Sequence, residues 1–88
     1  MTWNRNTVEN KIVEVFKQHR QSDVEVEMTT KIVSDLGIDS LGVMEVLSEI
    51  EDEYKLVVPD DVLKSLETVG DVIKAITERL AQDGKLSD

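Results

Sequence analysis

Three separate stretches of this 88-residue chain repeat apolar residues at the spacing of a helix face. In the first, at about residues 7–19, the repeat runs i, i+4, i+7, i+8, which is typical of an amphipathic helix. The second stretch begins near Ser40, and the third follows Thr68. The three apolar faces consist of Val8, Ile12, Val15 and Phe16, then Val43, Val46, Leu47, Ile50 and Tyr54, and then Val69, Val72, Ile73, Ile76 and Leu80. The pattern predicts three main amphipathic helices.

Residues that favour helix starts precede each of these stretches. Asn6 followed by Glu9 fits the N-cap and N3 positions of a capping box for the first helix. Asp39 is a good N-cap for the second helix. Thr68 followed three residues later by Asp71 is an acidic variant of the capping box for the last.

The segments between the predicted helices differ in length. Residues 20–39 have no sustained period, and we expect a long first loop anchored in the core by Met28, Ile32 and Leu36. Residues 60–66 are long enough for only one or two helical turns and predict a short extra helix. The predicted fold class is therefore all-α, a small four-helix bundle with a long first loop.

A chain of this length, with one proline and four glycines, points to a single small domain. We place that domain at residues 6–81. Residues 1–5 are expected to form an N-terminal extension, and residues 82–88 a polar, frayed C-terminal tail.

Composition excludes several classes of function. The chain has no cysteine, so it can form no disulfide, no thiolate metal site and no thiol nucleophile of its own. No apolar run approaches the length of a membrane span, and the N-terminus lacks the apolar segment of a signal peptide. A net charge of −9 argues against nucleic acid binding. We expect a monomer in the cytoplasm that binds neither membranes nor nucleic acid.

The negative charge is concentrated in one part of the chain. Between Asp35 and Asp61 there are nine acidic residues against Lys55 alone, a net of −8, and the remaining residues together contribute −1. A local patch of this kind favours docking onto a basic surface of a partner protein. A solvated helix face is the alternative, because charge runs often have no other role.

Ser40 lies between two glycines in the stretch G37-I-D-S-L-G42. A serine hydrolase is disfavoured, because the glycine spacing differs from G-x-S-x-G and no strand precedes the serine. The EF-hand pattern fails at positions 6 and 12 of its loop, where Ser40 and Val46 replace glycine and glutamate. Two alternatives stay open for Ser40. It is either a helix-start residue, or an attachment point for a phosphodiester that the helix N-terminus would favour.

The chain resembles acyl carrier proteins. The resemblance begins with L36-G-I-D-S-L41 and the acidic helix V43-M-E-V-L-S-E-I-E-D-E-Y54, and it continues without a gap through V57-V-P-D60 and L66-E-T-V-G-D-V-I73. With the first helix it covers about residues 6–80. It implies a carrier domain at residues 6–81 and a carrier, not an enzyme. Ser40 would receive 4′-phosphopantetheine from coenzyme A through a dedicated phosphopantetheinyl transferase, and acyl groups would be held as thioesters on the arm.

The resemblance also implies roles for two groups of residues. Acyl-loading and acyl-processing enzymes with basic docking surfaces would meet Asp39, Leu41, Met44, Glu45, Glu51, Asp52 and Asp60. The acyl chain would be sheltered by Leu47, Ile50, Tyr54, Val58, Leu63, Leu66 and Val72. From the sequence alone, each residue of the second group is equally an ordinary core residue.

Some positions depart from the pattern of fatty-acid carriers. Gly42 replaces an acidic or polar residue, Ser48 and Leu63 replace an apolar and a small one, and Lys64 adds a positive charge. The resemblance implies a carrier for fatty-acid, polyketide-type or other specialised acyl biosynthesis, and these departures favour a specialised carrier over the housekeeping fatty-acid one. Gly42 also keeps a D-alanyl or aminoacyl carrier open. The alternative of another class is an acidic helical interaction module that has the carrier fold but no prosthetic group.

Overall fold

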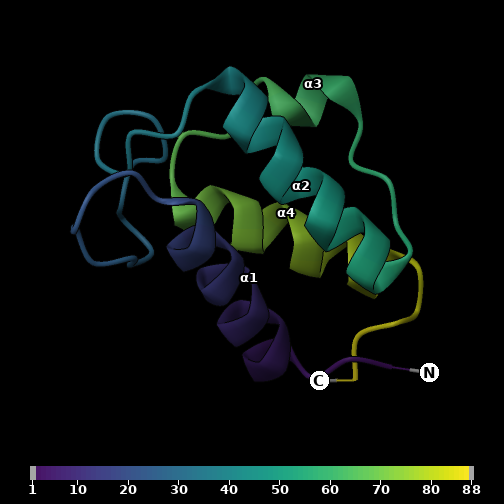
Figure 1. Cartoon of the computed structure of the whole chain (residues 1–88). Coiled ribbons are helices and arrows are strands. Elements are labelled where there is room, and N and C mark those ends of the chain that lie inside the picture. Colours follow the sequence, from purple (N-terminus) through teal and green to yellow (C-terminus); the bar gives the residue numbers. More distant parts are fainter. Residues whose placement is uncertain (1, 88) are drawn as a thin grey trace.

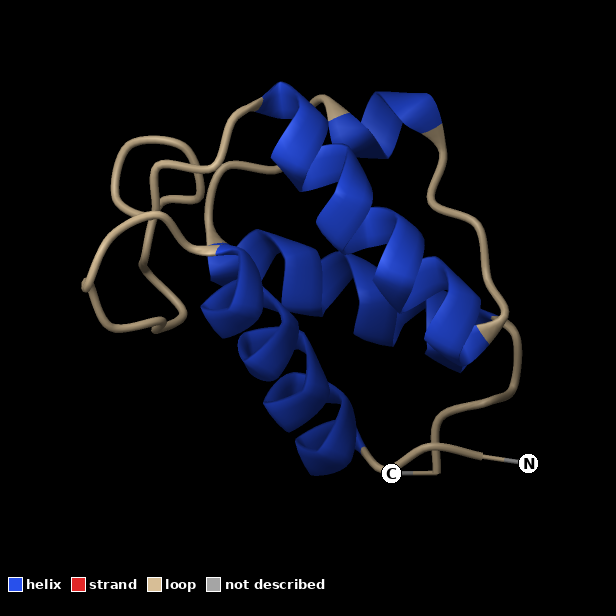
Figure 2. Ribbon diagram, viewed as in Figure 1, coloured by secondary structure: helices blue, strands red, loops and turns tan. Residues whose placement is uncertain are grey.

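The computed structural model describes residues 2–87, which form four helices and no strand (Figure 1). Three are long, namely α1 (Arg5–His19), α2 (Ser40–Tyr54) and α4 (Val69–Gln82). The fourth, α3, is a single turn at Asp60–Leu63. Helix α1 packs against both α2 and α4. A long loop of residues 20–39 joins α1 to α2, and the shorter segment 55–59 joins α2 to α3 (Figure 2). The predicted all-α bundle of three main helices and one short helix is confirmed.

The core forms where the apolar faces of the three long helices meet. All the predicted face residues of α1 and α4 are buried, and so are those of α2 except Val43, which is half-buried. Burial of these faces supplies the main driving force for folding. Helix α3 contributes no buried residue, because one turn presents too little apolar surface to reach the centre.

The helix caps agree with the sequence at two of three sites. Asp39 caps α2, and Thr68 with Asp71 forms a complete capping box on α4. The prediction for α1 was wrong, because the helix begins two residues earlier than expected. Asn4, not Asn6, is the N-cap, and its side chain accepts hydrogen bonds from the Asn6 and Thr7 N–H groups.

The loop from residue 20 to residue 39 is held by backbone as well as by side chains. Ile32 and Leu36 are buried as expected, but the side chain of Met28 is exposed, so its prediction as a core anchor is wrong. Its carbonyl makes the contact instead, accepting a 2.9 Å hydrogen bond from the Gly70 N–H. A Cβ at residue 70 would lie 2.8 Å from that carbonyl oxygen, so only glycine allows this approach.

The two ends of the chain pair with each other. Trp3 donates its N–H to the Lys85 carbonyl at 2.6 Å, and its own carbonyl accepts a bond from the Ser87 N–H at 2.8 Å. Residues 3 and 86 thereby form a parallel β-bridge. The Lys85 ammonium donates to the Lys55 carbonyl just beyond α2. The expectation of a frayed tail is therefore wrong for residues 82–87.

Candidate functional site

Ser40 is the first residue of α2, and it is exposed. The N-cap Asp39 satisfies two of the first backbone donors: its side chain accepts from the Gly42 N–H at 2.8 Å and its carbonyl from the Val43 N–H at 2.9 Å. Within residues 2–87, the N–H groups of Ser40 and Leu41 have no such partner. The helix dipole and these two donors favour an anion next to the Ser40 hydroxyl.

The first turn of α2 packs tightly against the residue that precedes its cap. Ile38, directly before the cap, is buried at 3 % exposure. A Cβ added to Gly42 would lie 2.6 Å from Ile38 Cγ2 and 3.3 Å from the capping oxygen of Asp39. Gly42 therefore lets the loop close against α2, and sequence reasoning missed this because Ile38 was not among the expected anchors.

No base of residues 2–87 is hydrogen-bonded to Ser40, although His19 and the residues on either side of Ser40 line one hollow. The Ser40 hydroxyl makes no hydrogen bond within residues 2–87. His19 at the end of α1 lies near α2, but its Nε2 is 2.8 Å from Glu49 Oε2, more than two helical turns beyond Ser40. Nor do residues 2–87 bring together three side chains that could hold a metal ion.

Most of the predicted partner-contacting residues lie on the surface. Leu41 and Met44 are 66 % and 62 % exposed, and they lie three positions apart in the first turns of α2. Four of the predicted partner contacts are acidic residues with exposed side chains, namely Asp39, Glu45, Asp52 and Asp60.

Glu51 differs from the other predicted partner contacts. It is half-buried, and its Oε2 accepts a 2.7 Å hydrogen bond from the Val58 N–H. This bond ties α2 to the segment that leads into α3. The sequence offered no signal for it, because the two residues are seven positions apart across a loop.

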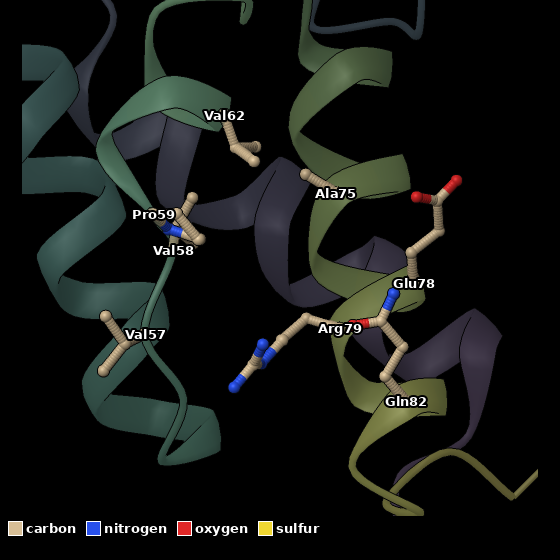
Figure 3. Close-up of a pocket in the computed structure, with 8 residues that line it drawn as sticks. All are labelled: Val57, Val58, Pro59, Val62, Ala75, Glu78, Arg79 and Gln82. Carbon is tan, nitrogen blue, oxygen red and sulfur yellow. The ribbon is translucent and has the colours of Figure 1, made fainter.

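The predicted acyl-pocket lining lies in and around the closed core. Leu47, Ile50, Tyr54, Val58 and Val72 are buried, whereas Leu63 and Leu66 are half-buried against the core. Burial, with a smaller contribution from Glu53, raises the pKa of Tyr54 to about 12. A surface hollow of about 160 Å³ lies next to this region, between residues 57–59 and α4, and it shares Val58 with the predicted lining (Figure 3).

Among the helices of residues 2–87, none has both the length and the apolar character that are needed to cross a membrane.

Comparison with known proteins places this geometry in context. The family model described as "phosphopantetheine attachment site" matches residues 7–76. An acyl carrier protein of Sulfurovum sp. (strain NBC37-1) is 42 % identical over 62 residues, which are 70 % of this chain and 83 % of that protein. One from Caulobacter vibrioides (strain NA1000 / CB15N) is 35 % identical over 72 residues, covering 81 % and 92 % of the two chains.

Solved structures show the same likeness. The acyl carrier protein of Enterococcus faecalis, studied for its high thermal stability, superposes with a TM-score of 0.74 at 33 % identity. That match covers 90 % of this chain and 99 % of the other. A putative acyl carrier protein from Mycobacterium tuberculosis also reaches 0.74, at 27 % identity, covering 81 % and 96 % of the two chains.

Proposed function

Since this chain belongs to the acyl carrier protein family, whose members are phosphopantetheine-bearing carriers and not enzymes, we propose that Ser40 is the attachment point of the 4′-phosphopantetheine arm. The observation that carries the proposal is the exposed Ser40 hydroxyl at the N-terminus of α2, beside backbone donors that have no partner among residues 2–87. A phosphodiester placed there would meet the positive end of the helix dipole.

The residues present fit such a group. Asp39 holds the first turn of α2 in place by accepting from the Gly42 N–H, so the neighbouring donors point outward in a defined direction. The exposed position gives a transferase access to the hydroxyl, and the transferase would supply the base, since no residue of 2–87 is hydrogen-bonded to the Ser40 hydroxyl. When bound, the arm supplies the thiol that the cysteine-free chain does not have, and acyl groups are carried on it as thioesters.

We further propose that the protein acts as a cytoplasmic monomer in fatty-acid, polyketide-type or another specialised acyl biosynthesis, with its carrier domain at residues 6–81. Leu41 and Met44 supply exposed apolar contacts, and Glu45 and Asp52 supply the charge that attracts a basic partner surface. Seven residues, among them Leu47 and Ile50, are proposed to shelter the acyl chain. Because the core is closed, their side chains would have to move apart before the chain could enter.

Intact mass tests the attachment directly. The apo-protein is incubated with coenzyme A, magnesium and a phosphopantetheinyl transferase of broad specificity, and one phosphopantetheine is expected to be added. Ser40→Ala should add none. Ser48→Ala is the matched control, since Ser48 is exposed on the same helix, and it should be modified like the wild type. Addition to Ser40→Ala, or none to the wild type, contradicts the proposal.

The absence of a mass gain in the wild type would also distinguish a carrier from another class of protein. An interaction module with the carrier fold but no prosthetic group would show no mass gain and would bind its partners equally well with Ser40→Ala.

A further inference from the structure

The hollow between α4 and the segment that joins α2 to α3 has an apolar wall. Val57, Val58 and Pro59 supply one side, and Val62 of α3 and Ala75 of α4 point toward each other across its upper end (Figure 3). Val57 is 69 % exposed, so this wall is open to solvent. An apolar group entering here would gain contact without displacing any core residue.

One cation extends into this hollow. Figure 3 shows the Arg79 side chain reaching from α4 toward residues 57–59. Glu78 and Gln82 of α4 also line the hollow, and the Glu78 carboxylate is directed away from residues 57–59. The ion pair of Arg79 joins its Nε to Asp83 Oδ2 at 3.4 Å, an i, i+4 contact between partly exposed side chains. Within residues 2–87 the two terminal amino groups of the guanidinium have no partner, so they are available to a carboxylate that enters the hollow.

Size and charge together narrow the class of ligand. A cavity of about 150 Å³ holds one benzene molecule, so the 160 Å³ here has room for a group of about six carbons. An arginine at the edge of an apolar wall favours an anionic end on that group.

We propose that this hollow receives the end of a short acyl cargo that carries a terminal carboxylate, with its methylenes against Val62 and Ala75 and its carboxylate on Arg79. The proposal rests on the proposed function, because the arm on Ser40 would deliver the cargo. Val58 belongs both to the predicted acyl lining and to this hollow, so a chain leaving the α2–α3 region meets the hollow there.

The test compares two cargoes of equal length. The full chain is loaded with adipyl-phosphopantetheine or with hexanoyl-phosphopantetheine, and intact mass confirms each load before any spectrum is recorded. In NMR spectra, the adipyl form should show contacts between cargo methylenes and the Ala75 methyl, and a shift of the Arg79 Nε–H signal. The hexanoyl form should leave the Arg79 signal in place.

Three variants sharpen the result. Arg79→Gln should abolish the adipyl contacts with Ala75, and Asp83→Asn should strengthen the adipyl-dependent shift because it removes the competing carboxylate. Lys11→Gln, which removes an exposed cation from α1, should change nothing. Adipyl contacts with the Leu47 and Ile50 methyls in place of Ala75, or equal contacts in Arg79→Gln, overturn the inference while the proposed function stands. A missing mass gain overturns both.

Discussion

At the scale of single residues, Gly42 and Ile38 form the tightest contact behind the candidate site. The missing Cβ of Gly42 leaves just enough space for the Ile38 Cγ2 methyl, which a Cβ would approach to 2.6 Å. Because Ile38 is β-branched and buried, it has little freedom to move aside. This packing accounts for Gly42 without reference to the cargo, which the sequence had suggested as its reason.

Gly42→Ala should therefore lower stability, although alanine is the better helix former. The crowding costs about 1–3 kcal/mol and outweighs a helix-propensity gain of about 0.5–1 kcal/mol. In an Ile38→Leu background, which removes the Cγ2 branch, the same change should become neutral or stabilising. Urea unfolding of the four proteins in this double-mutant cycle measures the coupling.

Gly70→Ala is the matched control for this cycle. Its added Cβ would meet the Met28 carbonyl, which is backbone, so Ile38→Leu should not relieve its cost. Equal stability losses for Gly42→Ala in both backgrounds would show that Ile38 is not the obstacle.

At the scale of elements, α2 presents acidic side chains that differ in their surroundings. Glu49 faces α1 and contacts His19, and Glu51 bonds to the Val58 N–H. Glu45 and Asp52 are exposed, and within residues 2–87 neither takes part in an ion pair. The last two are therefore the carboxylates most available to a partner, whereas a change at Glu51 would also disturb the link to α3.

Charge reversal of Glu45 and Asp52 to lysine should slow modification by the transferase several-fold at low ionic strength. The physical reason is the loss of long-range attraction, which salt screens over about 10 Å at 0.1 M. Modification rates measured at low and high salt, with circular dichroism to verify the helices, check this outcome.

A control with the same change in net charge is Glu14→Lys with Glu25→Lys, at exposed positions outside α2. Its modification rate should stay much nearer that of the wild type. If both double variants slow equally, the overall charge matters and the patch on α2 is only a solvated face.

At the scale of the whole molecule, the two chain ends close over the far end of α2. The Trp3 ring meets Tyr54 edge-on, with ring centroids 4.7 Å apart at 88°. The β-bridge to Leu86 holds Trp3 in this place, and both residues pack against the core. Trp3, which lies outside the region of family resemblance, thus covers one end of the predicted acyl lining.

Trp3→Ala should destabilise the fold by about 1–3 kcal/mol, because it removes an aromatic pair and the apolar area of a half-buried ring. It should also lower the pKa of Tyr54 from about 12 toward 10, since burial is the main cause of the raised value. Ultraviolet titration of the single tyrosine measures this pKa, and urea unfolding measures the stability.

The sign of the pH effect follows from the raised pKa. The folded state favours the neutral phenol, so this contribution is fully present below pH 10 and is lost between pH 10 and about 12. The wild type should lose stability over that window, and Trp3→Ala should lose less. Trp3→Phe keeps an aromatic ring and serves as the control; a Tyr54 pKa that stays near 12 in Trp3→Ala would show that Trp3 does not cover the phenol.

Local patterns in the sequence were enough to predict the parts of the molecule that depend on near neighbours. The three long helices follow from apolar spacing, and the caps at Asp39 and Thr68 follow from residues three positions apart. Ser40 at the start of α2 and the acidic character of that helix follow in the same way. A helix turn involves only residues within four positions, so the chain alone contains the information.

The tertiary structure decided the contacts between residues that are distant in sequence or separated by a loop. These include the bond from Val58 to Glu51 and the cover that Trp3 places on Tyr54. Met28 shows the difference most clearly. The sequence predicted that its side chain would anchor the loop in the core, but the side chain is exposed and the Met28 carbonyl holds the loop by accepting from the Gly70 N–H. Backbone groups and loop geometry leave no periodic signal, and they are placed only when the helices pack.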